Sequence, residues 1–533
     1  MLVLGALGGC GGTKKEQLRA AMTTVDITPD KSVFLEGYGG REESCYANMP
    51  EDFTSDIRAR ILALEKDGKR TVFINTETVI SAVGIDGAQS SFSMFFLNNV
   101  AKEAELEVED VILCNTHNHQ AMRTMSRTQE KTIIEGVKRA FESLTPVSVG
   151  VGVISTQYGV SRSPWYTINK RTPYDALMTV VRFDESGSGR PMGMIYSVPI
   201  HNTMYGNGPG NIEHWDQLNC EFTGYASRYI EQQMAGENPE FVAMHINGFY
   251  GNSGPIYNDE YYVRSLEELQ AAGESFGEEV MSCYSGVETV EHRGELQSKM
   301  LTDSLETNVA DRRFEQYFGN NDKLPLYITL SSFGDIVFVG VNYEAFSITG
   351  AHLKAEAPYR HVLPAGGVRL WSGYIPTRET FENAENEAEC QPYKTAFDAQ
   401  TEEIFYEKLI NGLCGFKGVR INRLRGERSE PSGEGVYSFD YGGTIKPDKL
   451  VVSFGQRYRT DCASDFTVRL FDENGKERYS QSFTGNSVNY LGIFLDGIAF
   501  SSAQVTVQSA YMGETDISAL PVDVYGVEFV AEK

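Results

Sequence analysis

Residues 111–119 read Val-Ile-Leu-Cys-Asn-Thr-His-Asn-His, which joins a continuous apolar run to two histidines. An apolar run this short is typical of a strand that is buried on both faces of a sheet. In an extended chain residues i and i+2 point the same way, so His117 and His119 converge beyond the strand. Open α/β sheets place ligands at the carboxyl ends of their strands. The stretch therefore predicts a metal or catalytic site, and a pair of hydrogen-bonded loop histidines is the alternative.

The flanking sequence alternates between strand and helix patterns. Strand-like runs occur at residues 71–75, 194–200, 241–246 and 336–341, and segments with helical periodicity at 92–104, 130–142, 222–234, 264–283 and 399–413. Such alternation indicates an α/β body. We predict a mixed-sheet metallohydrolase catalytic domain over residues 19–422.

A polar stretch at residues 423–435 ends this pattern. Strand-like runs follow at 449–454, 466–471, 488–494, 504–508 and 522–530, with turn signals such as Glu473-Asn474-Gly475 between them. Residues 436–533 are predicted to form a smaller β-sandwich of the immunoglobulin-like or jelly-roll type. Four of its tyrosines would suit stacking on carbohydrate, although strand tyrosines are more often packed: Tyr437, Tyr441, Tyr458 and Tyr479.

The composition excludes several classes of protein. The 533 residues contain 47 Lys and Arg against 73 Asp and Glu, a net charge of −26. A chain this acidic is repelled by nucleic acid and by anionic membrane surfaces, so neither is an expected partner. Apolar residues make up 41% and charged residues 23%, the usual range for a globular protein, which excludes a disordered chain. No apolar run reaches the ~18 residues of a membrane-spanning helix.

Residues 1–18 are predicted to be a truncated lipoprotein-type signal and linker. A short apolar stub precedes Leu7-Gly8-Gly9-Cys10, and small residues before a cysteine resemble a bacterial lipobox, although the basic region and most of the apolar region are missing. The hypothesis is that Cys10 is lipidated and attaches the chain to the cell envelope, on its periplasmic or outer-membrane face, or that the chain is secreted. An initiator tail with an ordinary cysteine is the alternative. The eight cysteines contain no CxxC pair, so no zinc finger is indicated.

Two other strand ends carry candidate ligands. His201 follows the run 194–200, and Glu344 follows the run 336–341. Taken singly, a histidine at such a position is more often structural, and a carboxylate there often caps the next helix. Together with His117 they supply three N/O ligands with an open position, which is the donor set of a catalytic zinc site.

The order of these motifs resembles the neutral/alkaline non-lysosomal ceramidases, zinc amidases that cleave the N-acyl bond of ceramide. The matching segments are Val25-Asp26-Ile27-Thr28-Pro29, Leu35-Glu36-Gly37-Tyr38-Gly39, Arg70-Thr71-Val72-Phe73-Ile74, Thr116-His117-Asn118-His119, Ser161-Arg162-Ser163-Pro164 with Tyr166, His201-Asn202-Thr203, Gly224-Tyr225-Ala226-Ser227, Tyr343-Glu344-Ala345-Phe346 and Tyr374-Ile375-Pro376-Thr377. They span roughly residues 19–385, and their order is more specific than any single motif.

The resemblance implies a zinc ion bound by His117, His201, Glu344 and Tyr374. It also implies that His119 and Arg162 polarise the amide and stabilise the oxyanion, for which the rigid donor fork of an arginine is suited. His119 and Glu344 are candidates for proton transfer to the departing amine. A phenol with a pKa of about 10 is an unusual ligand, so Tyr374 as a hydrogen-bond donor is the alternative. Without the resemblance, Arg162 and Tyr374 would be interpreted as a surface ion pair and a core ring.

The sequence departs from the family motifs at two places. Residues 120–122 read Gln-Ala-Met where the family has Ser-Gly-Pro, so the wall beside the metal differs. The family box Gly-Asp-Val-Ser-Pro is represented by residues 251–255, Gly-Asn-Ser-Gly-Pro, which aligns Gly254 with the serine. Two alternatives follow: Ser253 performs the role of the family serine after a shift of one residue, or that role is lost. The candidate substrate-binding residues are Ser253, Asn252 and Tyr166.

The leading hypothesis is a zinc-dependent amide hydrolase that releases fatty acid and a sphingoid base from ceramide or a related lipid amide. One alternative is a related metallohydrolase that acts on a different ester or amide. A barrel amidohydrolase also places His-x-His after a strand, but its bridging lysine and late aspartate are not found in order. Another alternative is a surface-anchored lipoprotein that binds glycan or lipid. The sequence leaves the oligomeric state open.

Overall fold

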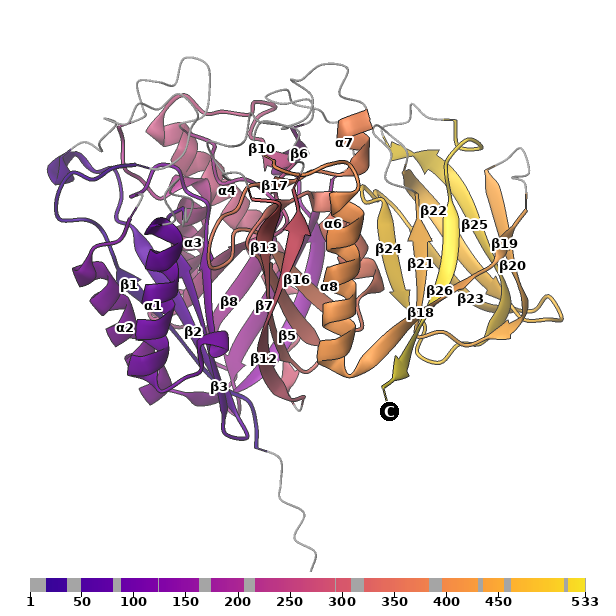
Figure 1. Ribbon diagram of the computed structural model, residues 1–533, viewed down its shortest axis with the longest axis horizontal. Helices are drawn as coiled ribbons and strands as arrows, with labels where there is room; N and C mark the ends of the chain where they lie inside the picture. Colours follow the sequence, from indigo (N-terminus) through magenta and orange to yellow (C-terminus); the bar gives the residue numbers. More distant parts are fainter. Residues whose placement is uncertain are drawn as a thin grey trace, which may run out of the picture.

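The computed structural model describes residues 16–35, 49–79, 88–122, 124–162, 174–205, 216–292, 294–307, 321–382, 395–429, 435–454, 462–511 and 516–532. Cys10 of the predicted lipobox and the candidate substrate residue Tyr166 lie outside these ranges. The described elements form a large α/β body followed by a smaller β-sandwich, as predicted (Figure 1).

The α/β body contains two main sheets. The larger sheet has the strand order β4 (Val111–Asn115), β3 (Lys69–Thr76), β2 (Arg58–Lys66), β1 (Arg19–Asp26), β5 (Thr145–Ser155), β7 (Leu177–Glu185), β8 (Pro191–Val198) and β9 (Val242–Asn247), with β11 (Val290–Glu291) beside β5. The second sheet has the order β12 (Leu296–Glu306), β13 (Lys323–Phe333), β14 (Ile336–Val341) and β16 (His361–Ala365). Both sheets combine antiparallel with parallel pairs, which confirms the predicted mixed sheet.

Alternate residues of each buried strand face two different cores. In β3, Phe73 packs in the core between the two sheets, against Phe338 of β14. Val72 and Ile74 point the other way, toward the helices that cover the sheet. This is why the strands read as continuous apolar runs, since neither face of the sheet is exposed.

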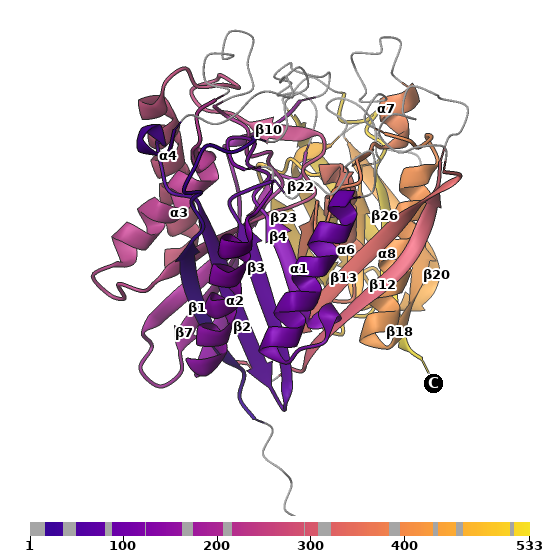
Figure 2. The ribbon, with the colours of Figure 1, turned by 60° about the vertical axis from the view of Figure 1, so that its left-hand side comes forward.

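Helices cover the outer faces of both sheets, and their described bounds are η1 (Pro50–Asp52), α1 (Ala88–Ala104), η2 (Val108–Asp110), α2 (Arg127–Glu142), α3 (Glu221–Met234), α4 (Leu266–Ser285), α6 (Ser347–Glu356), α7 (Arg378–Glu382) and α8 (Thr401–Lys417). Helices α1 and α2 pack on β1 to β4 (Figure 2), α3 and α4 on β7 to β9, and α6 and α8 on the second sheet. The helices predicted near these positions are confirmed. No described helix has the length and apolar character needed to cross a bilayer.

Two short strand pairs lie beyond the ends of the long strands. Strand β6 (Gly159–Ser161) pairs with β10 (Ser253–Pro255), and β15 (Glu344–Ala345) pairs in parallel with β17 (Tyr374–Ile375). They lie near one another at the upper edge of the body in Figure 1. These short pairs carry or adjoin most of the candidate site residues.

The carboxyl-terminal sandwich packs two sheets around one apolar core. One sheet has the order β18 (Val419–Arg425), β26 (Asp523–Ala531), β21 (Lys449–Ser453) and β24 (Tyr490–Phe494). The other has the order β19 (Glu427–Arg428), β20 (Val436–Ile445), β25 (Phe500–Ala510), β22 (Ala463–Phe471) and β23 (Glu477–Phe483). Strand β18 follows α8 directly, so the sandwich sheet begins at Val419, before the polar stretch at which the sequence pattern changes.

The sandwich joins the body along helix α6. The ammonium group of Lys449 in β21 is buried and donates to the carbonyls of Ala357, at 2.7 Å, and Tyr359, at 3.3 Å. Burial lowers the pKa of Lys449 to about 7. Gly492 of β24 lies so close to Ala355 that a Cβ there would come within 2.4 Å of the Ala355 carbonyl oxygen. The two units therefore share a tightly packed seam.

Candidate metal centre

His117, His201 and Glu344 meet although they lie far apart in the sequence. His117 follows β4, His201 follows β8, and Glu344 begins β15. One ligand atom from each lies within 4.8 Å of the others, and all three side chains are buried. His201 Nε2 is 2.9 Å from one Glu344 carboxylate oxygen, and His117 Nε2 is 3.8 Å from the other.

The backbone at His117 adopts an unusual conformation that Asn115 holds in place. His117 has a φ of +57°, in the left-handed region that few residues other than glycine adopt. The Asn115 side-chain oxygen accepts the His117 backbone N–H at 2.9 Å, and its amide nitrogen donates to the Gly367 carbonyl at 2.8 Å. This Asx-type turn ends the strand and directs the His117 ring toward Glu344.

The protonation of His201 follows from its neighbours. Its Nδ1 lies 2.8 Å from the Ser253 carbonyl oxygen, and because a carbonyl only accepts, Nδ1 carries the proton. The lone pair of Nε2 therefore points into the cluster, where the Arg162 guanidinium lies 2.7 Å away. A histidine held by a carbonyl on one nitrogen, with the lone pair of the other directed at neighbouring candidate ligands, has the usual orientation of a metal ligand.

Two other rings contact His117. The Tyr250 phenol oxygen lies 3.0 Å from His117 Nδ1, and His119 Nε2 lies 3.0 Å from His117 Nε2. The predicted convergence of His117 and His119 is therefore present, and their ring centroids are 4.7 Å apart. His119 is partly exposed, whereas His117 is buried.

Glu344 is oriented by the short β15–β17 pair rather than by a helix. Its register partner in β17 is Tyr374, and its backbone N–H donates to the Gly373 carbonyl at 2.9 Å. The Trp371 indole N–H donates to a Glu344 carboxylate oxygen at 2.5 Å. Helix α6 begins three residues later with Phe346 as its N-cap residue, so Glu344 does not cap it.

Arg162 and Tyr374 lie beside the three ligands, inside the protein. Arg162 donates to the Tyr374 phenol oxygen and to the Gly251 carbonyl, each at 3.2 Å. Burial alone would lower the pKa of Arg162, but Tyr261, Tyr374 and Glu344 raise it, so the guanidinium stays charged. Burial and the Glu344 charge raise the pKa of Tyr374, so the phenol keeps its proton in this arrangement. Arg162 is therefore not part of a surface ion pair, and Tyr374 is not an isolated core ring, which were the interpretations without the resemblance.

A divalent cation fits this donor set. Two imidazole nitrogens and a carboxylate direct their lone pairs at one point inside the protein, and such groups repel one another unless a cation or a proton lies between them. Nitrogen and oxygen donors in this number, with a position left open, are typical of a catalytic zinc site.

The other substrate candidates serve the protein itself in this structure. The Ser253 hydroxyl donates to the Pro199 carbonyl, while the Ser253 carbonyl holds the His201 ring. The Asn252 side-chain oxygen accepts the backbone N–H of Ser347 at 2.7 Å and so caps helix α6. A substrate-binding role for Ser253 and Asn252 stays a prediction, and Tyr166 lies outside the described residues.

Gly254 makes room for Tyr261. A Cβ at residue 254 would lie 2.1 Å from the Tyr261 phenol oxygen and 2.4 Å from its ring carbon Cζ. Tyr261 is buried and lies close enough to Arg162 to raise the pKa of that group. The family serine is therefore incompatible with this tyrosine, and a phenol lies near the guanidinium instead.

This exclusion predicts a specific coupling. Gly254→Ser is expected to lower the free energy of unfolding by about 1–3 kcal/mol, because the added atoms overlap the Tyr261 ring. The double variant Gly254→Ser/Tyr261→Ala removes the overlap. Its loss of unfolding free energy should therefore be smaller, by at least about 0.5 kcal/mol, than the sum of the losses in the two single variants. Denaturant unfolding measures all three, with Gly236→Ser as the control because no atom approaches that position. If the losses of unfolding free energy in the two single variants add up to the loss in the double variant, the proposed overlap is contradicted.

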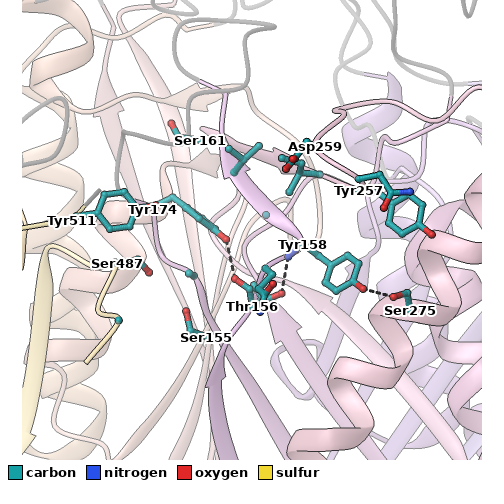
Figure 3. Close-up of a pocket in the computed structure, with 17 residues that line it drawn as sticks. Ser155, Thr156, Tyr158, Ser161, Tyr174, Tyr257, Asp259, Ser275, Ser487 and Tyr511 are labelled. Carbon is teal, nitrogen blue, oxygen red and sulfur yellow. Dashed lines mark hydrogen bonds between the residues drawn. The ribbon is translucent and has the colours of Figure 1, made fainter. Parts of the chain in front are cut away.

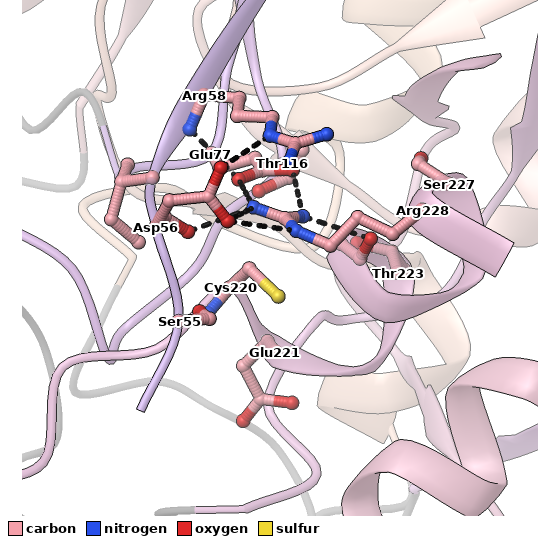
Figure 4. A network of polar contacts seen from close by, with 12 residues as sticks. Ser55, Asp56, Arg58, Glu77, Thr116, Cys220, Glu221, Thr223, Ser227 and Arg228 are labelled. Atoms are coloured by element: carbon pink, nitrogen blue, oxygen red, sulfur yellow. Dashed lines mark hydrogen bonds and ion pairs between the residues drawn. The ribbon is translucent and has the colours of Figure 1, made fainter. Parts of the chain in front are cut away.

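A buried ionic network supports the loop that carries both histidines (Figure 4). Glu77 accepts from Arg60 at 2.6 Å and from Arg228 at 2.7 Å. The backbone carbonyl of Glu77 accepts the Asn118 side-chain amide at 3.2 Å, and Asn118 lies between the two histidines. Glu77 thereby links this loop to Arg228 of helix α3.

Sequence reasoning missed the residues that orient the ligands. Tyr250 follows the predicted strand at residues 241–246. Its position after the end of a strand could have indicated that it lies near the site. Trp371 precedes Tyr374 by three residues and is one of 3 tryptophans in the chain. Asn115, directly after the apolar run, is a common turn residue. None of the three is a ligand type that a search for metal sites selects.

The comparisons with known proteins place this geometry in a known fold. No family model and no curated protein sequence matches the chain. The structure of neutral ceramidase from Pseudomonas aeruginosa aligns with a TM-score of 0.60 and 16% identity, over 97% of this chain and 99% of that one. A structure described as a ceramidase complexed with C2 aligns with a TM-score of 0.58 and 14% identity, over the same shares. The predicted resemblance is thus confirmed for the fold.

Proposed function

We propose that this chain, which has the neutral ceramidase fold, is a zinc-dependent amide hydrolase that cleaves the N-acyl bond of ceramide or a related lipid amide. The observation that carries the proposal is the convergence of His117, His201 and Glu344 within 4.8 Å inside that fold. Substrate, metal and reaction are all part of the proposal. A C2 ligand in a ceramidase of this fold supports a lipid amide as the substrate.

In this proposal the three ligands hold zinc, with Tyr374 as a fourth ligand or as a hydrogen-bond donor. A zinc ion at such a site lowers the pKa of bound water to about 7 and so supplies a nucleophile at neutral pH. Arg162 remains charged, and its guanidinium lies 2.7 Å from His201 Nε2. With that nitrogen bound to a metal, the N–H group would be available to stabilise the oxyanion.

Proton transfer is assigned to His119 and Glu344. The departing amine needs a proton, because an amide anion is a poor leaving group. His119 is partly exposed and its Nε2 faces the cluster, so it can donate on the open side. Glu344 is buried and already accepts from Trp371, which favours ligation with a secondary part in proton transfer.

The test combines metal analysis with turnover. We expect about one zinc per purified chain, as for a catalytic site with three protein ligands. We also expect release of fatty acid from a short-chain fluorescent ceramide, which a chelator abolishes and added zinc restores. Zinc without release would retain the site and redirect the search to other amides or esters. A chain that binds no metal would contradict the proposal and favour the binding-protein alternative.

Attachment to the cell envelope through a lipidated Cys10 stays a prediction. It concerns residues outside the described ranges, and it is independent of the metal centre.

A further inference from the structure

A cavity of about 640 Å³ lies where the α/β body meets the sandwich (Figure 3). Its walls come from the turn between β5 and β6, the segment after β10, helix α4 and two sandwich segments. The volume is in the range of small-molecule sites. Ser161, which also lines the cavity, is followed by Arg162, so the cavity lies next to the metal centre without containing any of its ligands.

Tyrosines are the most distinctive feature of the lining. Tyr158, Tyr174, Tyr257 and Tyr511 all border the cavity. Figure 3 shows Tyr174 and Tyr511 toward one side and Tyr158 and Tyr257 toward the other. Tyr158, Tyr257 and Tyr511 are partly exposed at the cavity, and each also packs against a hydrophobic core that holds its ring in place. A tyrosine offers a flat apolar face together with a polar edge.

The rest of the lining is polar and carries little charge. Hydroxyl and amide groups predominate, and Asp259 is the one ionisable acid among the described lining residues, which include no lysine, arginine or histidine. The Ser487 hydroxyl oxygen is buried and has no hydrogen-bond partner in the described part of the chain. An acyl chain would leave such groups unpaired, which is costly. Among the described lining residues, a phosphate or carboxylate would meet Asp259 and no compensating cation.

The wall formed by the β5–β6 turn is preorganised. Glu279 of α4 accepts the Thr156 hydroxyl at 2.5 Å and the Gln157 backbone N–H at 3.1 Å. The Tyr158 and Ser275 hydroxyl groups lie 2.5 Å apart, and the Tyr158 backbone N–H donates to Thr156 at 3.1 Å. These contacts fix the turn before any ligand arrives, which lowers the entropic cost of binding.

We propose that this cavity binds the ring of a neutral sugar. A pyranose presents a face of C–H groups, which packs on a tyrosine ring, and an edge of hydroxyls, which both donate and accept hydrogen bonds. The described lining residues offer these two surfaces and no cationic side chain. The ligand is held by both units, with Tyr511 and Ser487 supplied by the sandwich.

The residues involved differ from the sandwich tyrosines that the sequence singled out. The Tyr437 and Tyr441 phenols donate to the Ile517 and Val524 carbonyls, and Tyr437 is fully buried. Tyr458 lies outside the described residues. Tyr479 is partly exposed and does not line the cavity, so it provides a matched control.

Titration calorimetry of the full chain tests the proposal. The probes are D-glucose, D-galactose, N-acetyl-D-glucosamine and lactose, with D-glucuronate as the anionic comparison. We expect saturable binding of at least one neutral sugar and at least about tenfold weaker binding of glucuronate. Co-sedimentation with phosphatidylcholine vesicles that carry monogalactosyldiacylglycerol distinguishes a glycolipid head group from a free saccharide. That lipid has no amide, so the result does not depend on the proposed hydrolase activity.

Two variants on opposite walls locate the site. Tyr511→Ala and Tyr257→Ala should each weaken sugar binding by about twofold to tenfold, as expected for one aromatic contact. Tyr479→Ala should bind like the parent chain. Circular dichroism checks that each variant is folded, and because the two walls are altered separately, one misfolded variant leaves the other informative. Failure of every neutral sugar and of the vesicles, or unchanged binding in both folded variants, would overturn the proposal. Glucuronate binding as tight as that of the neutral sugars would also contradict it.

Discussion

His117→Ala is expected to abolish both metal binding and ceramide turnover. The substitution removes one of three ligand nitrogens and oxygens that lie within 4.8 Å. Loss of an outer partner of a metal ligand typically costs about 10–100-fold in affinity, and loss of the ligand itself should cost more. Elemental analysis of the purified variant and fatty-acid release from the fluorescent ceramide measure the two effects.

The matched control is His361→Ala. His361 begins β16 and does not belong to the His117, His201 and Glu344 group, so its loss should leave zinc content and turnover unchanged. Thermal unfolding of both variants verifies that they are folded. A folded His117→Ala chain that retains zinc and turnover would contradict the proposed site.

Glu77→Gln is expected to lower the free energy of unfolding by about 3–5 kcal/mol. The Glu77 side chain is 1% exposed and accepts from both Arg60 and Arg228. Arg60 keeps Glu231 and Arg228 keeps Asp56 as partners, but without the Glu77 charge the guanidinium groups of this network outnumber its carboxylates. Asn118 is bonded to the Glu77 backbone, so the loop that carries His117 is expected to loosen as well. Denaturant unfolding measures the cost.

The same residue predicts a pH dependence. Burial alone would raise the pKa of the Glu77 carboxyl, but the charges of Arg228 and Arg60 lower it below its ordinary value. A carboxyl whose pKa is lowered by folding stabilises the protein above its unfolded pKa of about 4.3, and this contribution is lost as the pH falls below that value. Stability of the parent chain should therefore fall on acidification, and Glu77→Gln should show a shallower fall.

Glu103→Gln provides the comparison for Glu77. Glu103 pairs with Lys138 at 2.8 Å on the surface, where solvent screens the interaction. Its loss should leave the unfolding midpoint essentially unchanged. Equal effects of the two substitutions would show that burial of the Glu77 network contributes nothing to stability.

Local patterns in the sequence were sufficient for most of the fold. The run at residues 111–114 is β4, and Phe73 alternates with Val72 and Ile74 between two cores. Side-chain periodicity follows from backbone geometry, so it can be read without knowing which segments meet. His117 and His119 also lie together after this strand, but the left-handed backbone of His117, with a φ of +57°, and not an extended chain brings their rings together.

The meeting of distant segments depended on tertiary structure. Glu344 faces His201 because a two-residue parallel pair aligns Glu344 with Tyr374, and a pair this short leaves no periodic signal. Tyr261 occupies the space at Gly254, and Ser253 turns its hydroxyl to Pro199; a motif comparison shows neither. Trp371 contacts Glu344, and Tyr250 contacts His117, only because the packed strands bring these distant residues together.

The sequence by itself therefore determined the α/β class, the sandwich and the candidate metal ligands, whose role stays a prediction. Only the tertiary structure decided the protonation of His201, the buried charge of Glu77 and the tyrosine-lined cavity between the two units. The physical reason is that periodicity and residue type are local properties, whereas burial, electrostatic fields and cavities arise from atoms that distant segments bring together.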